Sequence, residues 1–338
     1  MNDPLCSDGP IWNVWLAAFH APTLAIADEL GVFAALHDHP ATSQELADAL
    51  HIEVRATESM LGLFAALDFL VRADDRFHLS DVARTYLLPT SDYYWGGFLH
   101  RIRTIPIDCT KLIDSLRRGQ AAHDARVSSA WRAPQPPAAA LVGFTHAMHA
   151  HSFALAARVI SRFRLAGTAR FLDVAGGSGS YSIAAARAYP ALRCSVLDLG
   201  PVCDVARTYT AKHGVDDRVD AIAGDMFADA WPIGYDRIFF SDIFHDWDDE
   251  RCRVLAAHAF AALPFGGRVL VHEMILGDAK DGPLNAIAYS MVMVFVTEGR
   301  QRSAHELIEL LESAGFIAPV LTMTAEGYAL IELTKPSS

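Results

Sequence analysis

Residues 171–182 read FLDVAGGSGSYS, and this stretch decides the fold of the chain. An apolar strand that runs through glycines into a helix is typical of the first strand and helix of a doubly wound α/β sheet. Glycines at such a turn let a ligand approach the backbone closely, and the helix N-terminus presents free amides to it. We therefore expect an α/β domain that binds a nucleotide-like ligand at this turn.

The rest of the C-terminal half fits the same sheet. Short apolar runs alternate with amphipathic helical patterns, which favours parallel strands joined by helices. The expected strands are residues 170–174, 194–199, 219–223, 237–242, 268–273, 318–322 and 329–334. We expect the last two strands to form an antiparallel hairpin at the edge of the sheet.

The residues around the turn favour S-adenosylmethionine over a dinucleotide. A dinucleotide fingerprint starting at Gly177 would need glycine at position 182, where the chain has Ser182, and the sequence contains no Gly-Lys-Ser/Thr phosphate loop. Asp173 ends the strand before the glycines, and a carboxylate there suits a ligand that carries an ammonium and a sulfonium. Asp198 ends the second strand and is placed to accept hydrogen bonds from two ribose hydroxyls, with helix capping as the alternative.

The N-terminal region has a helical pattern that ends in a hairpin. Thr42 or Ser43 can cap a short helix. The expected elements are two amphipathic helices within 11–36, helices at 44–50 and 54–67, and a hairpin at 69–79 that turns at 73–75. Together they predict a winged helix.

A winged helix can bind DNA or can serve to pair two copies of a chain. The would-be recognition helix offers Glu53, Arg55 and Glu58, without the basic cluster that phosphates and guanine edges require. We therefore favour a dimerisation module, and a metabolite-sensing regulator remains the alternative. A Pro-rich stretch at 133–137 reads as a joint, so the expected parts are 1–100 (dimerisation), 101–150 (helical linker and substrate-pocket segment) and 151–338 (catalytic).

Composition and charge narrow the class of protein. With 52% hydrophobic and 20% charged residues, the chain is typical of a compact globular enzyme. A net charge of −12 repels phosphate backbones, so no nucleic-acid partner is expected. The N-terminus lacks the basic region of a secretory signal, and acidic residues interrupt the apolar stretches, so we expect a cytoplasmic protein without a membrane partner. The scattered cysteines form no C-x-x-C pair, and no metal site is expected.

Residues 239–252, FFSDIFHDWDDERC, resemble the His-Asp-Trp signature of small-molecule O-methyltransferases of the caffeic-acid and acetylserotonin type. The resemblance extends to the glycine loop, to GDMF at 224–227, to TEGRQRS at 297–303 and to the winged-helix N-terminal region. It implies a Rossmann-like S-adenosylmethionine domain, a homodimer, and a bacterial role in tailoring aromatic natural products. The implied reaction is His-assisted in-line methylation of a hydroxyl, phenolic by expectation, on a small aromatic metabolite.

The resemblance also implies roles for individual residues. His245 resembles the general base, Glu273 the carboxylate that orients it, and Gln301 stands beside them. The implied cofactor contacts are Asp173, Gly176, Gly177, Gly179, Asp198, Asp225, Met226, Phe227, Ser241 and Trp247. Phe144, Met148 and His151 share one helical face and resemble a substrate-pocket lining, with core packing as the alternative.

The sequence departs from the family pattern at three places. Ala175 replaces the first glycine of the loop. Gln301 replaces a second carboxylate beside His245, and Ser241-Asp242 replace the basic residue that often precedes the histidine. A glutamine can hydrogen-bond to a histidine but cannot balance its positive charge. A non-methylating reaction that keeps S-adenosylmethionine, such as hydroxylation, decarboxylation or a pericyclic reaction, is therefore the alternative within this fold.

Overall fold

The computed structural model describes residues 5–105, 107–119, 121, 137–325 and 327–337. Its contacts divide the chain into two compact units, 1–106 and 107–338. The segment expected as a linker, 101–150, is thus shared between the units, and its expected boundary at 150 falls inside helix α10 (Ala138–Val159). Most of the Pro-rich stretch lies outside the described residues.

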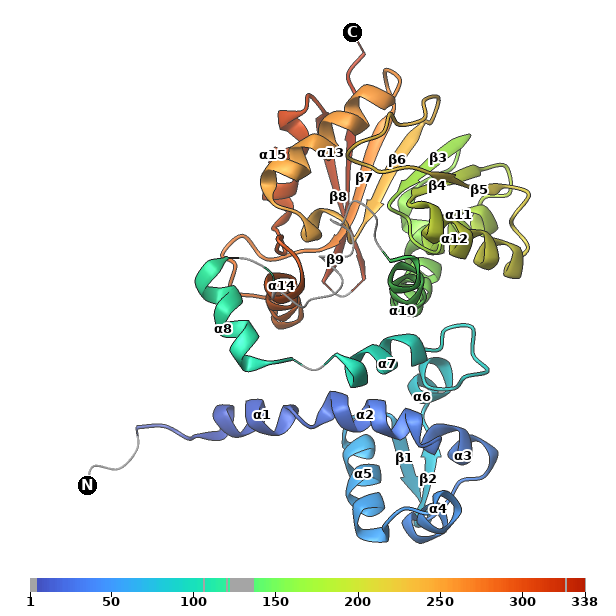
Figure 1. Cartoon of the computed structure of the whole chain (residues 1–338), viewed down its shortest axis with the longest axis vertical. Helices are drawn as coiled ribbons and strands as arrows, with labels where there is room; N and C mark the ends of the chain where they lie inside the picture. The colour runs from blue at the N-terminus through green and yellow to red at the C-terminus, as the bar shows by residue number, and fades with distance from the viewer. Residues whose placement is uncertain (1–4, 106, 120, 122–136, 326, 338) are drawn as a thin grey trace. The chain divides into compact units, whose positions relative to one another are not determined.

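The N-terminal unit combines helices with a two-stranded hairpin (Figure 1). Its elements are α1 (Gly9–Ala17), α2 (His20–Glu29), α3 (Val32–Asp38), α4 (Ser43–Leu50), α5 (Val54–Ala66), β1 (Leu70–Ala73), β2 (Arg76–Leu79), α6 (Asp81–Tyr86) and α7 (Gly96–Thr104). Thr42 caps α4 through a reciprocal capping box with Glu45. The expectation of two helices within 11–36 was wrong, because the helical structure is interrupted after Ala17 and again at Gly31, whose φ is 75°.

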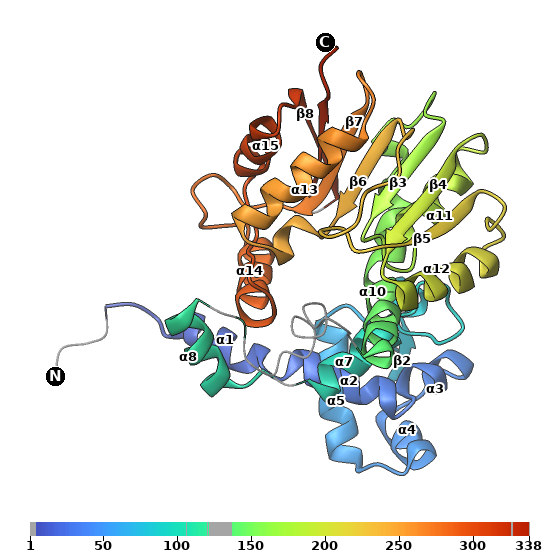
Figure 2. The same cartoon turned by 45° about the horizontal axis from the view of Figure 1, so that its top comes forward.

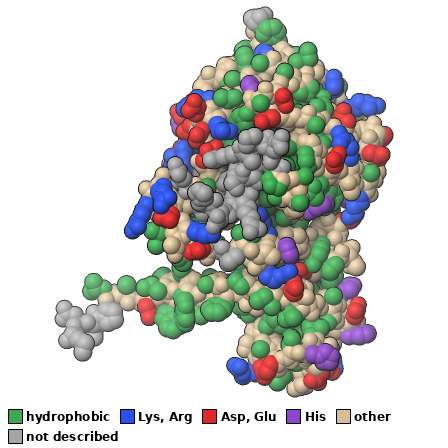
Figure 3. Space-filling model, in the orientation of Figure 1, with side chains coloured by type: hydrophobic (Ala, Val, Ile, Leu, Met, Phe, Trp, Pro, Cys, Tyr) green, Lys and Arg blue, Asp and Glu red, His purple; other side chains and the backbone are tan. Residues whose placement is uncertain are grey.

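Apolar side chains of this unit divide into a buried and an exposed set. Phe33, Leu61 and Phe64 form part of its core. None of the residues of α1 is buried, and Ile11 and Val14 are 73% and 78% exposed. Figure 3 shows hydrophobic side chains along the surface of these N-terminal helices.

Within the described residues no single helix is long and apolar enough to cross a membrane, although the bent pair Gly9–Glu29 and Val32–Asp38 meets the length and composition test.

The C-terminal unit is built on a seven-stranded sheet of order β5-β4-β3-β6-β7-β9-β8 (Figure 1 and Figure 2). Its strands are β3 (Arg170–Val174), β4 (Arg193–Asp198), β5 (Val219–Ala223), β6 (Arg237–Ser241), β7 (Arg268–Met274), β8 (Ile317–Ala325) and β9 (Tyr328–Thr334). The first five are parallel, and β9 pairs antiparallel with β7 and β8. The predicted α/β fold and the edge hairpin are confirmed, with strand ends shifted by a few residues at most.

The helices α8 (Cys109–Arg118) and α10, with the short 3-10 turn η1 (Ile160–Phe163), precede the sheet in the chain. Between its strands lie α11 (Ser180–Ala188), α12 (Gly200–Lys212), α13 (Asp249–Ala262), α14 (Leu284–Val296), α15 (Ala304–Ser313) and the 3-10 turn η2 (Phe244–Asp246). One group consists of α10, α11 and α12, and a second pairs α13 with α15. Helices on both sides explain why the middle residues of β6 are fully buried.

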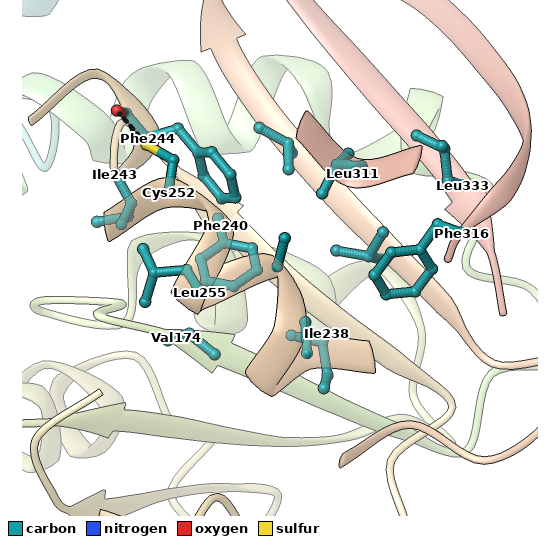
Figure 4. Close-up of a cluster of buried hydrophobic side chains, with 14 of the residues drawn as sticks. Val174, Ile238, Phe240, Ile243, Phe244, Cys252, Leu255, Leu311, Phe316 and Leu333 are labelled. Carbon is teal, nitrogen blue, oxygen red and sulfur yellow. Dashed lines mark hydrogen bonds between the residues drawn. The ribbon is translucent and has the colours of Figure 1, made fainter. Parts of the chain in front are cut away.

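The core of this unit fixes the segments that carry the site. Figure 4 shows Val174 of β3 and Phe240 of β6 with Leu255 of α13 in one apolar cluster. Cys252 donates a hydrogen bond from Sγ to the carbonyl of Phe244, 3.3 Å away, and so ties η2 to α13. The strand order reverses between β3 and β6, and ligands of doubly wound folds bind at the carboxyl ends of strands at such a point.

Candidate active site

The glycine loop after β3 folds back onto the carboxylate of Asp173. A Cβ atom on Gly176 would lie 2.6 Å from Cγ of Asp173, so only glycine fits there. Gly177 and Gly179 have φ values of 59° and 75°, in the left-handed region that glycine enters without strain. Ala175 is also left-handed, with φ 52°, although it has a Cβ. The side chain of Asp173 therefore leaves no room for a side chain at position 176 of the loop.

Asp173 is fully enclosed by its own loop and helix. Its Oδ2 accepts a hydrogen bond from Oγ of Ser182, 2.8 Å away. Burial raises the pKa of Asp173 to about 7. Ser182, whose presence in place of glycine argued against a dinucleotide, thus has a structural task at this carboxylate.

Asp198 reaches the same loop from the end of β4. Its Oδ2 accepts from the backbone N–H of Gly177 at 2.9 Å, and its Oδ1 accepts from that of Leu199 at 2.7 Å. Burial raises the pKa of Asp198 to about 6. A carboxylate accepts more than one hydrogen bond per oxygen, so Asp198 keeps lone pairs for further donors.

The GDMF turn meets the His-Asp-Trp segment. Asp225 Oδ1 accepts from the N–H of Phe227 at 2.8 Å and shapes the turn, while the carbonyl of Met226 accepts from the indole of Trp231. The rings of Phe227 and Trp247 lie edge to face with centroids 4.8 Å apart. These two segments, far apart in sequence, therefore form one aromatic wall.

A cation and an unpartnered donor complete that wall. The guanidinium of Arg251 lies 5.0 Å from the ring centroids of both Phe227 and Trp247. Trp247 Nε1 is buried and has no hydrogen-bond partner among the described residues. A buried donor of this kind calls for an acceptor that the chain itself does not supply.

His245 occupies η2, directly after β6, and is 4% exposed. Its Nδ1 atom lies 3.3 Å from Oε2 of Glu273 and 3.0 Å from the side-chain amide of Gln301. The other oxygen of Glu273 accepts from the N–H groups of Ile243 and Phe244, at 3.0 and 2.9 Å. Glu273 therefore holds both the imidazole and the backbone that carries it.

The surroundings of His245 keep the imidazole neutral. Burial lowers the pKa of His245 to about 3, and the neighbouring His151 and Arg302 act in the same direction. Burial, with Asp242 nearby, raises the pKa of Glu273 well above its ordinary value. A neutral imidazole has one free lone pair, so it can accept a proton.

Two acceptor oxygens decide which ring nitrogen carries the hydrogen. Glu273 Oε2 and Gln301 Oε1 both lack a partner within the described part of the chain. Rotating the Gln301 amide by 180° exchanges its oxygen and nitrogen without moving another atom. A hydrogen on His245 Nδ1 then satisfies both oxygens and leaves the lone pair on Nε2.

Ser241 lies at the end of β6, beside a second buried histidine. Its Oγ is 3.3 Å from Nδ1 of His272, which also lies 3.1 Å from the hydroxyl of Tyr181. His272 Nε2 is 2.7 Å from Oγ1 of Thr324. The hydroxyl of Ser241 thus contacts this internal network.

Asp242, His245 and Glu273 could together hold a metal ion. One ligand atom from each lies within 4.8 Å of the others. No metal site was expected from the sequence, because the cysteines form no C-x-x-C pair. The structure adds this cluster as a candidate, because Asp242 and His245 follow β6 and Glu273 lies in the neighbouring β7.

Of the expected pocket residues, His151 lies near His245. The ring of Tyr289, on α14, lies 5.3 Å from that of His245 and 6.4 Å from that of His151. Phe144 and Met148 are half-buried on the same helix as His151. Helices α10 and α14 therefore both contribute side chains that can bound an acceptor.

Sequence reasoning missed several side chains of this region. They are Ser178, Asp242, Tyr289 and Arg302. Asp242 was noticed only as a departure from a pattern, and Tyr289 lies in an apolar helix without any motif. Arg302 is 3% exposed and donates to the carbonyls of Phe244 and Trp247 at 2.7 and 2.8 Å, which its place in TEGRQRS could have suggested.

Comparison with known proteins gives matches for both units. Residues 110–317 match the model of an O-methyltransferase domain, and residues 15–89 match that of an O-methyltransferase dimerisation domain. The chain is 33% identical to 3-hydroxy-5-methyl-1-naphthoate 3-O-methyltransferase of Streptomyces sahachiroi, over 87% of this chain and 85% of that protein. It is 29% identical to acetylserotonin O-methyltransferase of Bos taurus, over 87% of this chain and 88% of that protein.

Solved structures show the same architecture. Human N-acetylserotonin methyltransferase, solved in complex with S-adenosylmethionine, superimposes with a TM-score of 0.84, covers 100% of both chains and is 24% identical. At that identity the likeness shows the fold. The likeness extends over both units of this chain.

Proposed function

We propose that this chain, which belongs to the O-methyltransferase family and uses S-adenosylmethionine, methylates a phenolic hydroxyl of a small aromatic metabolite with His245 as general base. The observation that carries the proposal is the buried, neutral imidazole whose Nδ1 faces Glu273. The comparisons support methyl transfer, and they support neither a non-methylating reaction nor a metabolite-sensing regulator.

The residues of the glycine loop fit the donor. Gly176, Gly177 and Gly179 keep the loop free of side chains, and Asp173 lies beneath it. In the proposal, Asp198 accepts hydrogen bonds from the ribose hydroxyls with the lone pairs left by Gly177 and Leu199. The negative charge at this edge of the sheet favours the ammonium and sulfonium groups of the donor.

The adenine site we infer is the aromatic wall. Phe227 and Trp247 offer ring surface, and the buried Nε1 of Trp247 offers the donor that lacks a partner among the described residues. Asp225 and Met226 lie at the turn next to this wall, as the resemblance implies. Ser241 is assigned a contact with the donor by resemblance, and its present neighbour is His272.

The chemistry divides simply between donor and protein. S-adenosylmethionine supplies a methyl group on a sulfonium, which is already activated for in-line displacement. The protein has to position the acceptor, exclude water and remove a proton. Phenols have a pKa near ~10, so at neutral pH the acceptor needs a base. His245 takes that proton on Nε2, while Glu273 stabilises the imidazolium through Nδ1.

An aromatic acceptor is supported by the walls of the pocket and by the relatives. Phe144, Met148 and His151 share a face of α10, and Tyr289 of α14 approaches both histidines. The names of the two relatives given above specify a hydroxynaphthoate and acetylserotonin as acceptors. We infer an acceptor of the same chemical class, a phenol on a fused or substituted aromatic ring.

The assembly we propose is a homodimer. The matched dimerisation domain and the exposed apolar side chains of α1 support it, because a surface of this kind is usually covered by a partner. The net charge of −12 supports a protein without nucleic-acid partners, and we propose the cytoplasm as its location.

A direct assay tests the proposed reaction. The protein is incubated with trideuteromethyl S-adenosylmethionine and a panel of phenols (N-acetylserotonin, 1-naphthol and catechol), and the labelled ether is located by mass spectrometry and NMR. We expect at least one phenol to be methylated on oxygen, and His245→Ala to lower turnover by about 10²- to 10⁴-fold. The matched control is His305→Ala, an exposed histidine on α15. Near-normal turnover of His245→Ala would refute the base assignment.

A further inference from the structure

A second carboxylate approaches His245 from the end of β6. Asp242 Oδ1 lies 3.8 Å from Nδ1 of His245. This oxygen is buried and has no hydrogen-bond partner among the residues that the structure describes. The other oxygen of Asp242 accepts from the hydroxyl of Tyr328 at 3.3 Å. One side of the carboxylate is therefore fixed, and the other is aimed at the imidazole.

The backbone places Asp242 there at a conformational cost. Its φ is 53°, in the left-handed region that non-glycine residues rarely adopt. Its N–H donates to the carbonyl of His272 at 3.1 Å, which continues the pairing of β6 with β7 for one more residue. Strained backbone that persists at a site is a reason to look for a function of the side chain.

Charge and hydrogen bonding are divided among the neighbours of His245 Nδ1. Gln301, at 3.0 Å, can orient the ring but carries no charge. Glu273, at 3.3 Å, uses its other oxygen for two backbone N–H groups. When the imidazole takes up a proton, a second negative group close to it stabilises the charged form.

We propose that Asp242 is a positioning residue for this reaction, supplying to the His245 imidazolium the second carboxylate that Gln301 cannot supply. The two departures from the family pattern, an acid at 242 and an amide at 301, are then one change: the charge has moved from one side of the histidine to the other. This inference rests on the proposed role of His245 as the base.

The protonation behaviour of Asp242 agrees with this role. Burial raises the pKa of Asp242 to about 7, so part of the ligand-free protein carries a proton there at neutral pH. Ionisation above that pH supplies the charge, and turnover of the wild type should therefore fall as the pH drops below 7. The other ionisable or charged groups facing His245 are Asp246 of η2, Glu273 of β7, Tyr289 of α14, His151 of α10 and Arg302 before α15.

The proposal is tested by removing the carboxylate at position 242 and placing one at position 301. The variants are Asp242→Asn, Gln301→Glu and the double variant Asp242→Asn/Gln301→Glu, assayed with the best phenol of the panel above. We expect Asp242→Asn to lower kcat about 10- to 100-fold, with little change in KM for S-adenosylmethionine, and to lose the decline of kcat between pH 7.5 and 6. The double variant should recover most of the lost kcat, because the negative charge is again beside Nδ1.

A control and a spectroscopic readout separate charge from folding. Asp236→Asn removes an acid at the opposite end of β6, where Asp236 accepts from the N–H groups of Ala169 and Arg170; its kcat should stay within about 2-fold of the wild type. In ¹⁵N NMR of the ligand-free protein, the ring signal of His245, identified by its loss in His245→Ala, should shift in the wild type as the pH passes through 7, and this shift should be absent in Asp242→Asn.

Each outcome decides a different claim. If Asp242→Asn keeps wild-type kcat and pH profile while His245→Ala is inactive, the role of Asp242 is wrong and the proposed function stands. If the double variant is no better than Asp242→Asn, charge is not what Asp242 contributes. If His245→Ala is active, the base assignment and this inference fail together. If a chelator abolishes wild-type turnover and Zn²⁺ restores it, the cluster is a metal site and the inference is overturned.

Discussion

His149 Nδ1 lies 2.8 Å from Oγ of Ser178, and this contact joins helix α10 to the glycine loop. Both side chains are buried, and Ser178 Oγ is a further 3.0 Å from Oγ of Ser180, the first residue of α11. The imidazole of His149 also stacks on Tyr209, with ring centroids 3.6 Å apart. The loop proposed to hold the donor and the helix proposed to hold the acceptor are thus parts of one packed network.

This link predicts that the two substrates bind cooperatively. S-adenosylhomocysteine should raise the affinity for the phenol in the wild type by about 5-fold, a coupling of roughly 1 kcal/mol, and Ser178→Ala should remove most of it. Calorimetry with and without S-adenosylhomocysteine measures the coupling. Arg158→Ala is the matched control, because Arg158 lies on the same helix with an exposed side chain. Equal coupling in Ser178→Ala and wild type would contradict the prediction.

Donor affinity should fall as the pH is lowered from 7.5 to 5. Burial raises the pKa of Asp198 to about 6 and that of Asp173 to about 7, so both take up protons over this range. A cationic ligand binds the ionised forms better, and binding then releases protons. Calorimetry should show a loss of at least ~10-fold at pH 5, with a smaller loss in Asp198→Asn. An affinity that stays constant with pH would count against charge complementarity at the loop.

The same carboxylates predict how stability of the ligand-free protein depends on pH. Their folded pKa values, about 7 and about 6, lie above the ordinary aspartate pKa of 3.8. Between those values the folded state binds more protons than the unfolded chain, so the free energy of unfolding decreases as the pH rises from ~4 to ~7. Asp173→Asn should flatten this decrease in denaturant titrations at pH 5 and pH 7.5. An undiminished slope would mean that other groups cause it.

Gly176→Ala should disable the loop. The added Cβ would lie 2.6 Å from Cγ and 2.8 Å from both carboxylate oxygens of Asp173, a side chain held by Ser182. The loop must move away, and we expect donor affinity to fall at least ~10-fold, or about 1.4 kcal/mol. Gly143→Ala is the control, because nothing lies within 4 Å of its added Cβ in α10 and alanine favours a helix. Calorimetry with S-adenosylhomocysteine compares the two variants.

Charges on α1 should separate the proposed dimer. Ile11→Asp/Val14→Asp puts two carboxylates on a face where these side chains are 73% and 78% exposed in the single chain. The mass from light scattering at micromolar concentration should fall from twice 36.8 kDa to 36.8 kDa. Val71→Asp, which is 54% exposed on the hairpin, should leave the mass unchanged. A wild type that is monomeric at this concentration would refute the dimer itself.

The sequence by itself determined the local structure and the class of the protein. The bounds of β3 and β5 follow from strand-forming and turn residues, which act over a few positions. The sequence left Thr42 and Ser43 open as the cap of α4, and the structure has Thr42 there. The signature at 239–252 pointed to the family, and the matched models agree. Between residues 11 and 36 the prediction rested on apolar spacing alone, and the predicted number of helices was wrong. The helix end at Gly31 is a local backbone change within an apolar stretch, which the spacing does not show.

Only the tertiary structure decided what surrounds the proposed base. His245, Glu273 and Gln301 come from η2, β7 and the segment before α15, and the fold brings Glu273 and Gln301 to within 3.3 Å of Nδ1 of His245. The direction of Asp242 depends on a left-handed φ and on Tyr328 of β9, neither of which a sequence pattern shows. The shifted pKa values of His245 and Asp242 arise mainly from burial. Burial belongs to the packed chain as a whole, and for that reason the residue types could be predicted but their charges could not.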